Sequence, residues 1–200
     1  MTKMTSVCVY CGSGEGRDER FAAAADALGA ALAAAGLTLV YGGGSIGLMG
    51  RVARATLNGG GHVIGVIPQF LHDREVMLRE VSELVITEDM HERKRIMFDR
   101  SDAFVALPGG IGTLEELVEI MTWAQLGRHD KPIVVANIAN FWDPLTELIE
   151  HMTVAGFIRP GWDVNFDVVD GVDHVVPTLN DRHAALAMSP QDKAPSAVRF

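Results

Sequence analysis

The sequence has 200 residues, of which 48% are hydrophobic and 22% charged, and its formal net charge is −9. This is the size and composition of one globular α/β domain; the chain is too apolar for a disordered protein, and it has no apolar run long enough to cross a bilayer. Its 17 basic and 26 acidic residues include no basic tract, which argues against a nucleic-acid partner but leaves room for a small anion bound by loops and helix ends.

Short β-branched runs alternate with longer helical patterns along the chain. In chain order we expect strand 7–10, helix 18–35, strand 37–41, helix 46–57, strand 62–67, strand 83–87, a helix from residue 89, strand 103–107, helix 113–126, strand 132–136 and helix 144–152. This alternation predicts a single α/β domain with a doubly wound parallel sheet and helices on both faces. Beyond Pro177 the pattern weakens, so we expect the domain to cover 1–180 and residues 181–200 to form a loose C-terminal tail.

Three of the expected strand-to-helix junctions are unusually rich in glycine: residues 11–14, 42–45 and 109–113. Glycine lets the backbone approach a phosphate closely, and the following helix directs its first N–H groups toward the anion. Any one such loop could be only a tight turn. Ligands of open parallel sheets bind beyond the carboxyl ends of the strands, so three such loops at one edge predict a nucleotide or sugar-phosphate site.

Two more specific nucleotide-binding patterns fit this sequence poorly. Residues 42–47 read G-x-G-x-x-G, but they follow the second strand instead of the first, and the next strand ends at residues 63–68 without the carboxylate that would hold a ribose. No glycine-rich loop continues into Gly-Lys-Ser/Thr, as a P-loop would. A nicotinamide-dependent redox enzyme is therefore disfavoured.

The two cysteines, Cys8 and Cys11, form a C-x-x-C pattern. A redox pair needs its first thiol at a helix N-terminus, where the thiolate is stabilised, whereas Cys8 falls inside a predicted strand. We expect one core cysteine and one loop cysteine in a reducing compartment. The first residues lack the features of a secretory signal, so the expected location is cytoplasmic.

The third glycine loop carries a resemblance to a known family. Residues 108–116 match the P-G-G-x-G-T-x-x-E motif of the LONELY GUY (LOG) proteins, which are often labelled lysine decarboxylases. The segments 89–94, 42–50 and 11–13 resemble the D-M-H-x-R-K, G-G-G-x-x-G-L-M-G and C-G-S motifs of the same family. The similarity covers about residues 5–160, with Thr122 in its last segment. Gly14 departs from the pattern, because many members carry a serine there.

The resemblance implies a Rossmann-like homodimer that hydrolyses the N-glycosidic bond of cytokinin riboside 5′-monophosphates, with AMP as a further candidate substrate. The products would be the free base and ribose 5-phosphate, with no metal or other cofactor and with no nucleic-acid or membrane partner. The decarboxylase label conflicts with the residues, because the domain body contains only Lys94 and Lys131 and neither has a pyridoxal-phosphate site around it. A non-catalytic nucleotide-binding module is the alternative; it would not need the residues of a catalytic centre.

Breaking an N-glycosidic bond passes through an oxocarbenium-like sugar, which a nearby carboxylate stabilises. The resemblance assigns this place to Glu116, although a nucleophile, an electrostatic stabiliser and a ribose ligand remain open as its role. It assigns Arg93 to the nucleotide or the departing base; otherwise Arg93 would be one more charge on a solvated face. The expected substrate- and phosphate-binding residues are Ser13, Gly43, Gly44, Glu75, Lys94, Gly109, Gly110, Gly112, Thr113, Glu115 and Thr122.

Among these, Gly110, Gly112 and Thr113 are expected to hold the phosphate through backbone N–H groups and the threonine hydroxyl, with Thr113 also a candidate N-cap. Glu115 and Glu119 fit the simpler interpretation of first-turn glutamates that complement the helix dipole. The histidines show no paired metal-ligand spacing, so no metal is expected.

Overall fold

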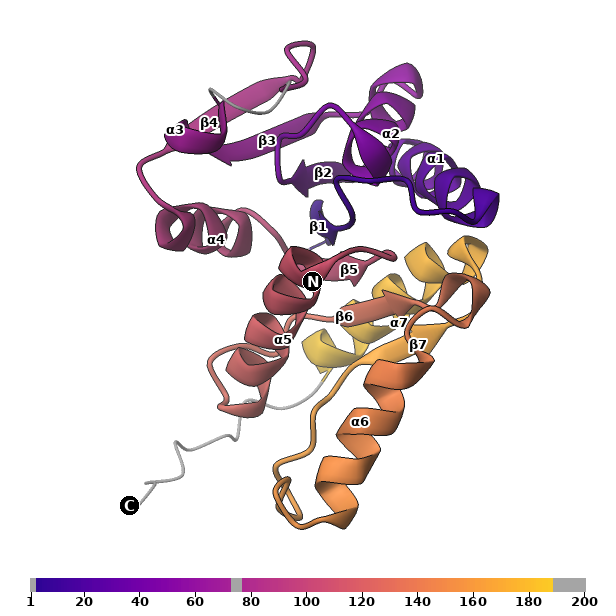
Figure 1. The fold of residues 1–200 in the computed structure, drawn as a ribbon, viewed down its shortest axis with the longest axis vertical. Helices are drawn as coiled ribbons and strands as arrows, with labels where there is room; N and C mark the ends of the chain where they lie inside the picture. The colour runs from indigo at the N-terminus through magenta and orange to yellow at the C-terminus, as the bar shows by residue number, and fades with distance from the viewer. Residues whose placement is uncertain (1–2, 73–76, 189–200) are drawn as a thin grey trace.

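Seven parallel strands form one sheet in the computed structural model, which describes residues 3–72 and 77–188 (Figure 1). The strands are β1 (Ser6–Tyr10), β2 (Thr38–Tyr41), β3 (Val63–Pro68), β4 (Glu83–Thr87), β5 (Ala103–Ala106), β6 (Ile133–Ala136) and β7 (Asp167–Val169). Their order across the sheet is β4-β3-β2-β1-β5-β6-β7, and every paired neighbour runs parallel. The chain winds outward from β1 in both directions, so the point where the winding reverses lies between β1 and β5.

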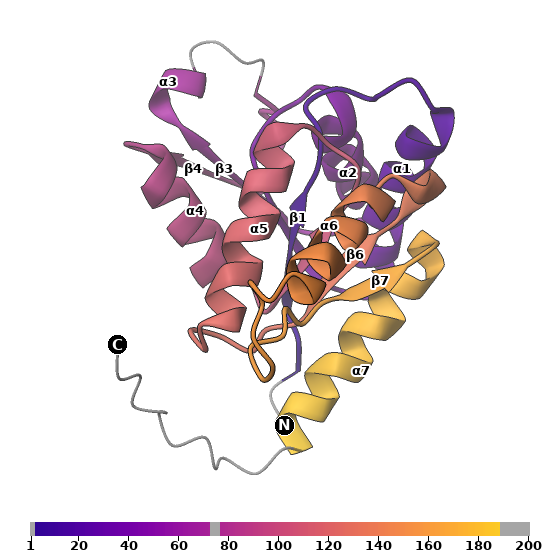
Figure 2. The same cartoon turned by 60° about the horizontal axis from the view of Figure 1, so that its bottom comes forward.

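The helices cover both faces of this sheet, as Figures 1 and 2 show. They are α1 (Glu19–Ala34), α2 (Gly47–Asn58), α3 (Gln69–His72), α4 (Met90–Asp99), α5 (Ile111–Gln125), α6 (Asp143–Val154) and α7 (Val175–Met188), with 3-10 turns η1 (Ile138–Asn140) and η2 (Val172–His174). One apolar cluster joins α1, α2 and α7 to the sheet, and a second joins α4, α5 and α6 to the opposite face. The expected doubly wound, Rossmann-like α/β fold is confirmed.

The central strand shows why both faces are covered. Along β1, Val7 and Val9 belong to the cluster under α1 and α2, whereas Cys8 and Tyr10 belong to the cluster under α4 and α5. All five residues of β1 are buried. Side chains alternate between the faces of a strand, so a continuous apolar run must be buried on both sides.

The C-terminal part differs from the sequence-based expectation. Helix α7 continues to Met188, eight residues past the expected domain end, and the short strand β7 precedes it. Pro177 is only the third residue of α7, where a backbone N–H has no helical partner in any case, so this proline does not interrupt the helix. Strand β7 lies at the sheet edge, has three residues and is partly exposed, which leaves little apolar pattern to detect.

Candidate active site

The three glycine-rich loops follow β1, β2 and β5, which are neighbours in the sheet. The Gly12 N–H donates a hydrogen bond of 3.1 Å to the Pro108 carbonyl, and this bond joins the loops after β1 and β5. The loop after β2 approaches as closely, because a Cβ at Gly47 would lie 2.2 Å from the Ser13 carbonyl carbon. The expected meeting of the glycine loops at the carboxyl edge is therefore confirmed.

A buried ion pair lies beside these loops. The Arg93 Nη1 on α4 donates to Glu116 Oε1 on α5 at 2.8 Å, and Arg93 Nε donates to the Val66 carbonyl at the end of β3 at 3.1 Å. Both charged residues are only 8% exposed. A Cβ at Gly42 would lie 2.2 Å from Arg93 Nη2, so the glycine in the loop after β2 makes room for the guanidinium.

The local sequence at the start of α4 determines the position of Arg93 beside the glycine loops. The Asp89 carboxylate caps α4 by accepting a 2.8 Å hydrogen bond from the Glu92 N–H, which starts the helix where the sequence predicts it. Arg93 then turns inward, while Arg100 at the end of α4 forms an exposed pair with Glu83. Of the charges on α4, Arg93 is the one buried under the glycine loops.

The side chain of Glu116 is buried from solvent. Burial raises the pKa of the Glu116 carboxyl above its usual range, while the positive charge of Arg93 opposes that rise. The side chains of Cys8 and Tyr10 lie under the same site on β1, and burial together with nearby negative charge, including that of Glu116, raises both of their pKa values. The Cys11 thiol is buried and its pKa is raised as well, so neither cysteine forms a reactive thiolate readily.

The phosphate-loop candidates lie at the start of α5. The helix begins at Ile111, its N-cap is Gly110, and no side chain caps it. Thr113, a candidate N-cap from the sequence, is therefore not the N-cap. It is buried in the first turn, and a Cβ at Gly109 would lie 2.2 Å from its Oγ1. No atom of the described residues lies within 4 Å of a Cβ position at Gly110 or Gly112, so the first turn of α5 is open to them.

The other expected binding residues lie in different surroundings from one another. Lys94 Nζ donates to Glu115 at 2.5 Å and to Glu119 at 3.0 Å, which ties α4 to α5 next to the buried pair. Thr122 is exposed and donates its hydroxyl to the Val118 carbonyl of its own helix.

Among the small residues, Gly43 has a φ of 79° in the loop after β2, which favours glycine there. Gly44 follows it and pairs with Met77 as an isolated bridge, and Ser13 lies in the loop after β1. Glu75 lies outside the described residues.

A cavity of about 290 Å³ adjoins these loops. Its lining combines the loops after β1 and β5 with Leu48 and with two aromatic side chains, Phe21 on α1 and Phe141 after η1. Sequence reasoning missed both phenylalanines, because they are 120 residues apart and lie in segments with no motif. The cavity places an apolar wall beside the candidate phosphate loop.

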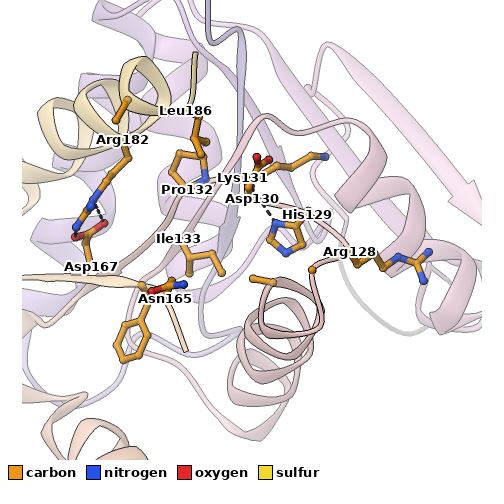
Figure 3. A pocket seen from close by; sticks show the side chains of 14 residues that line it. Arg128, His129, Asp130, Lys131, Pro132, Ile133, Asn165, Asp167, Arg182 and Leu186 are labelled. Atoms are coloured by element: carbon orange, nitrogen blue, oxygen red, sulfur yellow. Dashed lines mark hydrogen bonds and ion pairs between the residues drawn. The ribbon is translucent and has the colours of Figure 1, made fainter. Parts of the chain in front are cut away.

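A larger cavity of about 540 Å³ lies at the other, amino edge of the sheet, where β6 and β7 begin (Figure 3). None of the predicted site residues that the structure describes lines it. Figure 3 shows Arg182 paired with Asp167 across its wall, and the Lys131 N–H donates to His129 Nδ1 at 3.1 Å. The carboxyl edge, where the expected residues gather, is therefore the candidate active site.

Within residues 3–72 and 77–188, no group of three or more His, Cys, Asp or Glu side chains is arranged to hold a metal ion. The helices in that part of the chain are all too short or too polar to cross a membrane. The two lysines of the domain body are engaged: Lys94 in its two ion pairs, and Lys131 in a hydrogen bond from Nζ to the Phe98 carbonyl at 2.8 Å.

Comparison with known proteins places this arrangement in a family. A family model described as "Possible lysine decarboxylase" matches residues 49–179. The chain is 51% identical over 159 residues to the probable cytokinin riboside 5′-monophosphate phosphoribohydrolase LOGL2 of Oryza sativa subsp. japonica, covering 80% of this chain and 65% of the rice protein. The chain belongs to the LOG family.

A second LOG relative, the cytokinin riboside 5′-monophosphate phosphoribohydrolase LOG1 of Arabidopsis thaliana, is 50% identical over 159 residues, covering 80% of this chain and 75% of that protein. Among solved structures, the molybdenum cofactor binding protein of Rippkaea orientalis superimposes with a TM-score of 0.69 at 19% identity, covering 90% of this chain and 98% of that chain. At that identity the likeness concerns the fold alone.

Proposed function

We propose that this LOG protein hydrolyses the N-glycosidic bond of cytokinin riboside 5′-monophosphates, and of AMP, to the free base and ribose 5-phosphate. The relatives' names support the reaction class. The observation that carries the proposal is the buried pair of Arg93 and Glu116, which lies beside an open and uncapped helix N-terminus. A binding module would need the glycine loops but not a buried carboxylate next to them.

In this proposal the site has two parts. The 5′-phosphate binds the first turn of α5, where backbone N–H groups of Gly110 and Gly112 and the Thr113 hydroxyl face an anion favoured by the helix dipole. The side chain of Glu116 starts one turn further along the same helix. A ribose held by its phosphate therefore presents its anomeric carbon to the carboxylate of Glu116.

In the reaction, the bond between the anomeric carbon and the base nitrogen breaks and the sugar gains positive charge. The carboxylate of Glu116 stabilises this charge, and the dry surroundings strengthen the attraction. Arg93 favours the ionised form of Glu116 and offers a guanidinium to the base as it leaves with the bonding electrons. A water molecule adds to the sugar carbon and gives one proton to the base.

Further residues complete the site in this proposal. Ser13, Gly43 and Gly44 form its floor, and Gly109 lets the loop after β5 lie over Thr113. Lys94, Glu115 and Thr122 contact the substrate from the α4–α5 side, and Glu75 belongs to the same set.

We also propose a homodimer in the cytoplasm. Two apolar side chains lie at helical spacing on α5, Ile111 and Val118, and Leu126 follows at its C-cap; they are 82%, 42% and 64% exposed. Exposed apolar stripes mark interaction surfaces, and a second copy of the chain would bury this one beside Glu115. Sedimentation of Leu126→Glu tests the dimer: the variant should be monomeric where the parent protein is dimeric, and a monomeric parent protein would overturn the proposal.

The activity is tested by incubating the protein with AMP and with isopentenyladenosine 5′-monophosphate and measuring free base and ribose 5-phosphate. Equal amounts of the two products are expected from at least one substrate. Nucleotide binding without either product would show a binding module instead of a hydrolase.

A further inference from the structure

We propose that the cavity lined by Phe21 and Phe141 receives a second, apolar group carried on the 5′-phosphate, so that the protein also cleaves nucleotides whose phosphate is a diester. The inference rests on the proposed function, because it needs the phosphate at the first turn of α5. The same bond breaks: water adds to the anomeric carbon, the base leaves with a proton, and the other product is the ribose 5-phosphodiester.

The cavity lies beyond the phosphate loop as seen from the catalytic pair. Phe21 and Leu48 pack with the cluster on the α1–α2 face, whereas Arg93 and Glu116 lie between α4 and α5 on the opposite face. The loop that contains Gly110 lines the cavity and also begins α5. A phosphate at that loop therefore has the sugar on one side and the cavity on the other.

The residues that line the cavity favour an apolar group on the phosphate. Phe21 and Phe141 meet edge to face with ring centroids 5.6 Å apart, and Phe141 keeps 36% of its surface exposed. Among the described residues, no arginine, lysine or histidine lines this cavity, and the carboxylate of Glu15 in its lining pairs with Arg51 at 3.3 Å. A further phosphate would find no cation there, whereas a flat ring could pack against the two phenylalanines in the 290 Å³ available.

The segment that precedes Phe141 contains strained backbone. Ala139 and Asn140 have φ values of 57° and 60°, a left-handed conformation that non-glycine residues avoid. Asn137 fixes the turn: its Oδ1 accepts from the Trp142 N–H and its Nδ2 donates to Asp143, both at 2.7 Å. Strained backbone held in this way is concentrated at functional sites, and here it supports the placement of the Phe141 ring.

Gly14 offers a way to fill the cavity without strain. It lines the cavity, nothing lies within 4 Å of its Cβ position, and its φ is not in the left-handed region. Gly14→Leu therefore adds an apolar side chain to the wall of the cavity and narrows the space for the second group, whereas Phe141→Ala removes its aromatic wall. Phe157→Ala is the matched control, because that ring is 84% exposed beyond the end of α6 and is not among the lining residues.

The experiment compares three substrates: AMP, adenosine 5′-(methyl phosphate) and adenosine 5′-(phenyl phosphate). The two esters carry the same charge, so the ratio of their kcat/KM values for base release isolates the second group. We expect the parent protein and Phe157→Ala to favour the phenyl ester by about tenfold, and both cavity variants to reduce that ratio to about two or less.

The outcomes separate the two proposals. If AMP yields no base, the proposed function fails. If AMP is cleaved but the parent protein treats the phenyl and methyl esters alike, or if both cavity variants keep the tenfold ratio, the inference is overturned while the function stands. Should Phe141→Ala fail to fold, as its circular dichroism would reveal, Gly14→Leu decides the question alone.

Discussion

Replacing Arg93 by methionine would leave the Glu116 carboxyl buried without its partner. The two side chains are only 9% and 10% exposed, and the ion pair joins them at 2.8 Å. Removing one member of such a buried pair typically costs about 3–5 kcal/mol, mostly because the remaining charge has lost its water as well as its partner. Methionine keeps an unbranched apolar stem in place of that of arginine, so the loss reflects charge more than a cavity.

The cost should depend on pH in a definite direction. Burial raises the pKa of Glu116 above its ordinary value of 4.5, and Arg93 opposes that rise, so the variant raises it further. Between the unfolded and the folded pKa the folded protein holds more protons than the unfolded chain, and stability therefore falls as pH rises through that window. The variant should lose more stability than the parent protein, over a window that extends to higher pH.

Urea unfolding from about pH 4 to about pH 8 measures both effects. Arg100→Met is the matched control, because it breaks the exposed pair between Arg100 at the C-cap of α4 and Glu83 on β4, whose side chains are 42% and 39% exposed, and it should cost less than about 1 kcal/mol. The reasoning is refuted if Arg93→Met costs no more than Arg100→Met, or if its cost does not grow as pH rises.

Two further changes test the placement of the site. Gly42→Ala puts a methyl group 2.2 Å from Arg93 Nη2, so the guanidinium must move. Base release from AMP should therefore fall about a hundredfold. An unchanged rate would show that activity does not require Arg93 at this position. Asn137→Ala removes the hydrogen bonds to the Trp142 N–H and to Asp143. Thermal or urea unfolding should show that the free energy of unfolding falls by about 2 kcal/mol. A fall of less than about 0.5 kcal/mol would mean that the turn forms without these hydrogen bonds.

Much of the fold could be predicted because its signals are local. The continuous apolar runs, such as residues 103–106, must be buried on both faces, and the glycine loops mark the junctions that follow them. Asp89 predicts the start of α4 by capping it. The missed elements carry weak local signals: β7 is three residues long at an edge, and Pro177 lies in the one helical turn that tolerates proline.

The site itself is only partly visible in the sequence. The segment that contains Arg93 is rich in charge and reads equally well as a solvated face; its burial follows from α4 packing against α5, which brings Glu116 within 2.8 Å from 23 residues away. The contact between Phe21 and Phe141 depends on the order of strands in the sheet. No local pattern encodes such a meeting.

The measurement closest to the central claim compares kcat/KM for base release from AMP between Glu116→Gln and Glu119→Gln. Both residues lie on α5, but the Glu116 side chain is 10% exposed and paired with Arg93, whereas the Glu119 side chain is 26% exposed and paired with Lys94. Glutamine keeps the shape of the side chain and removes the charge that would stabilise the sugar cation. A fall of about a hundredfold or more, about 2.7 kcal/mol of transition-state stabilisation, is expected for Glu116→Gln and less than about threefold for Glu119→Gln. If Glu116→Gln retains activity within about threefold of the parent protein, the assignment of the catalytic carboxylate is wrong.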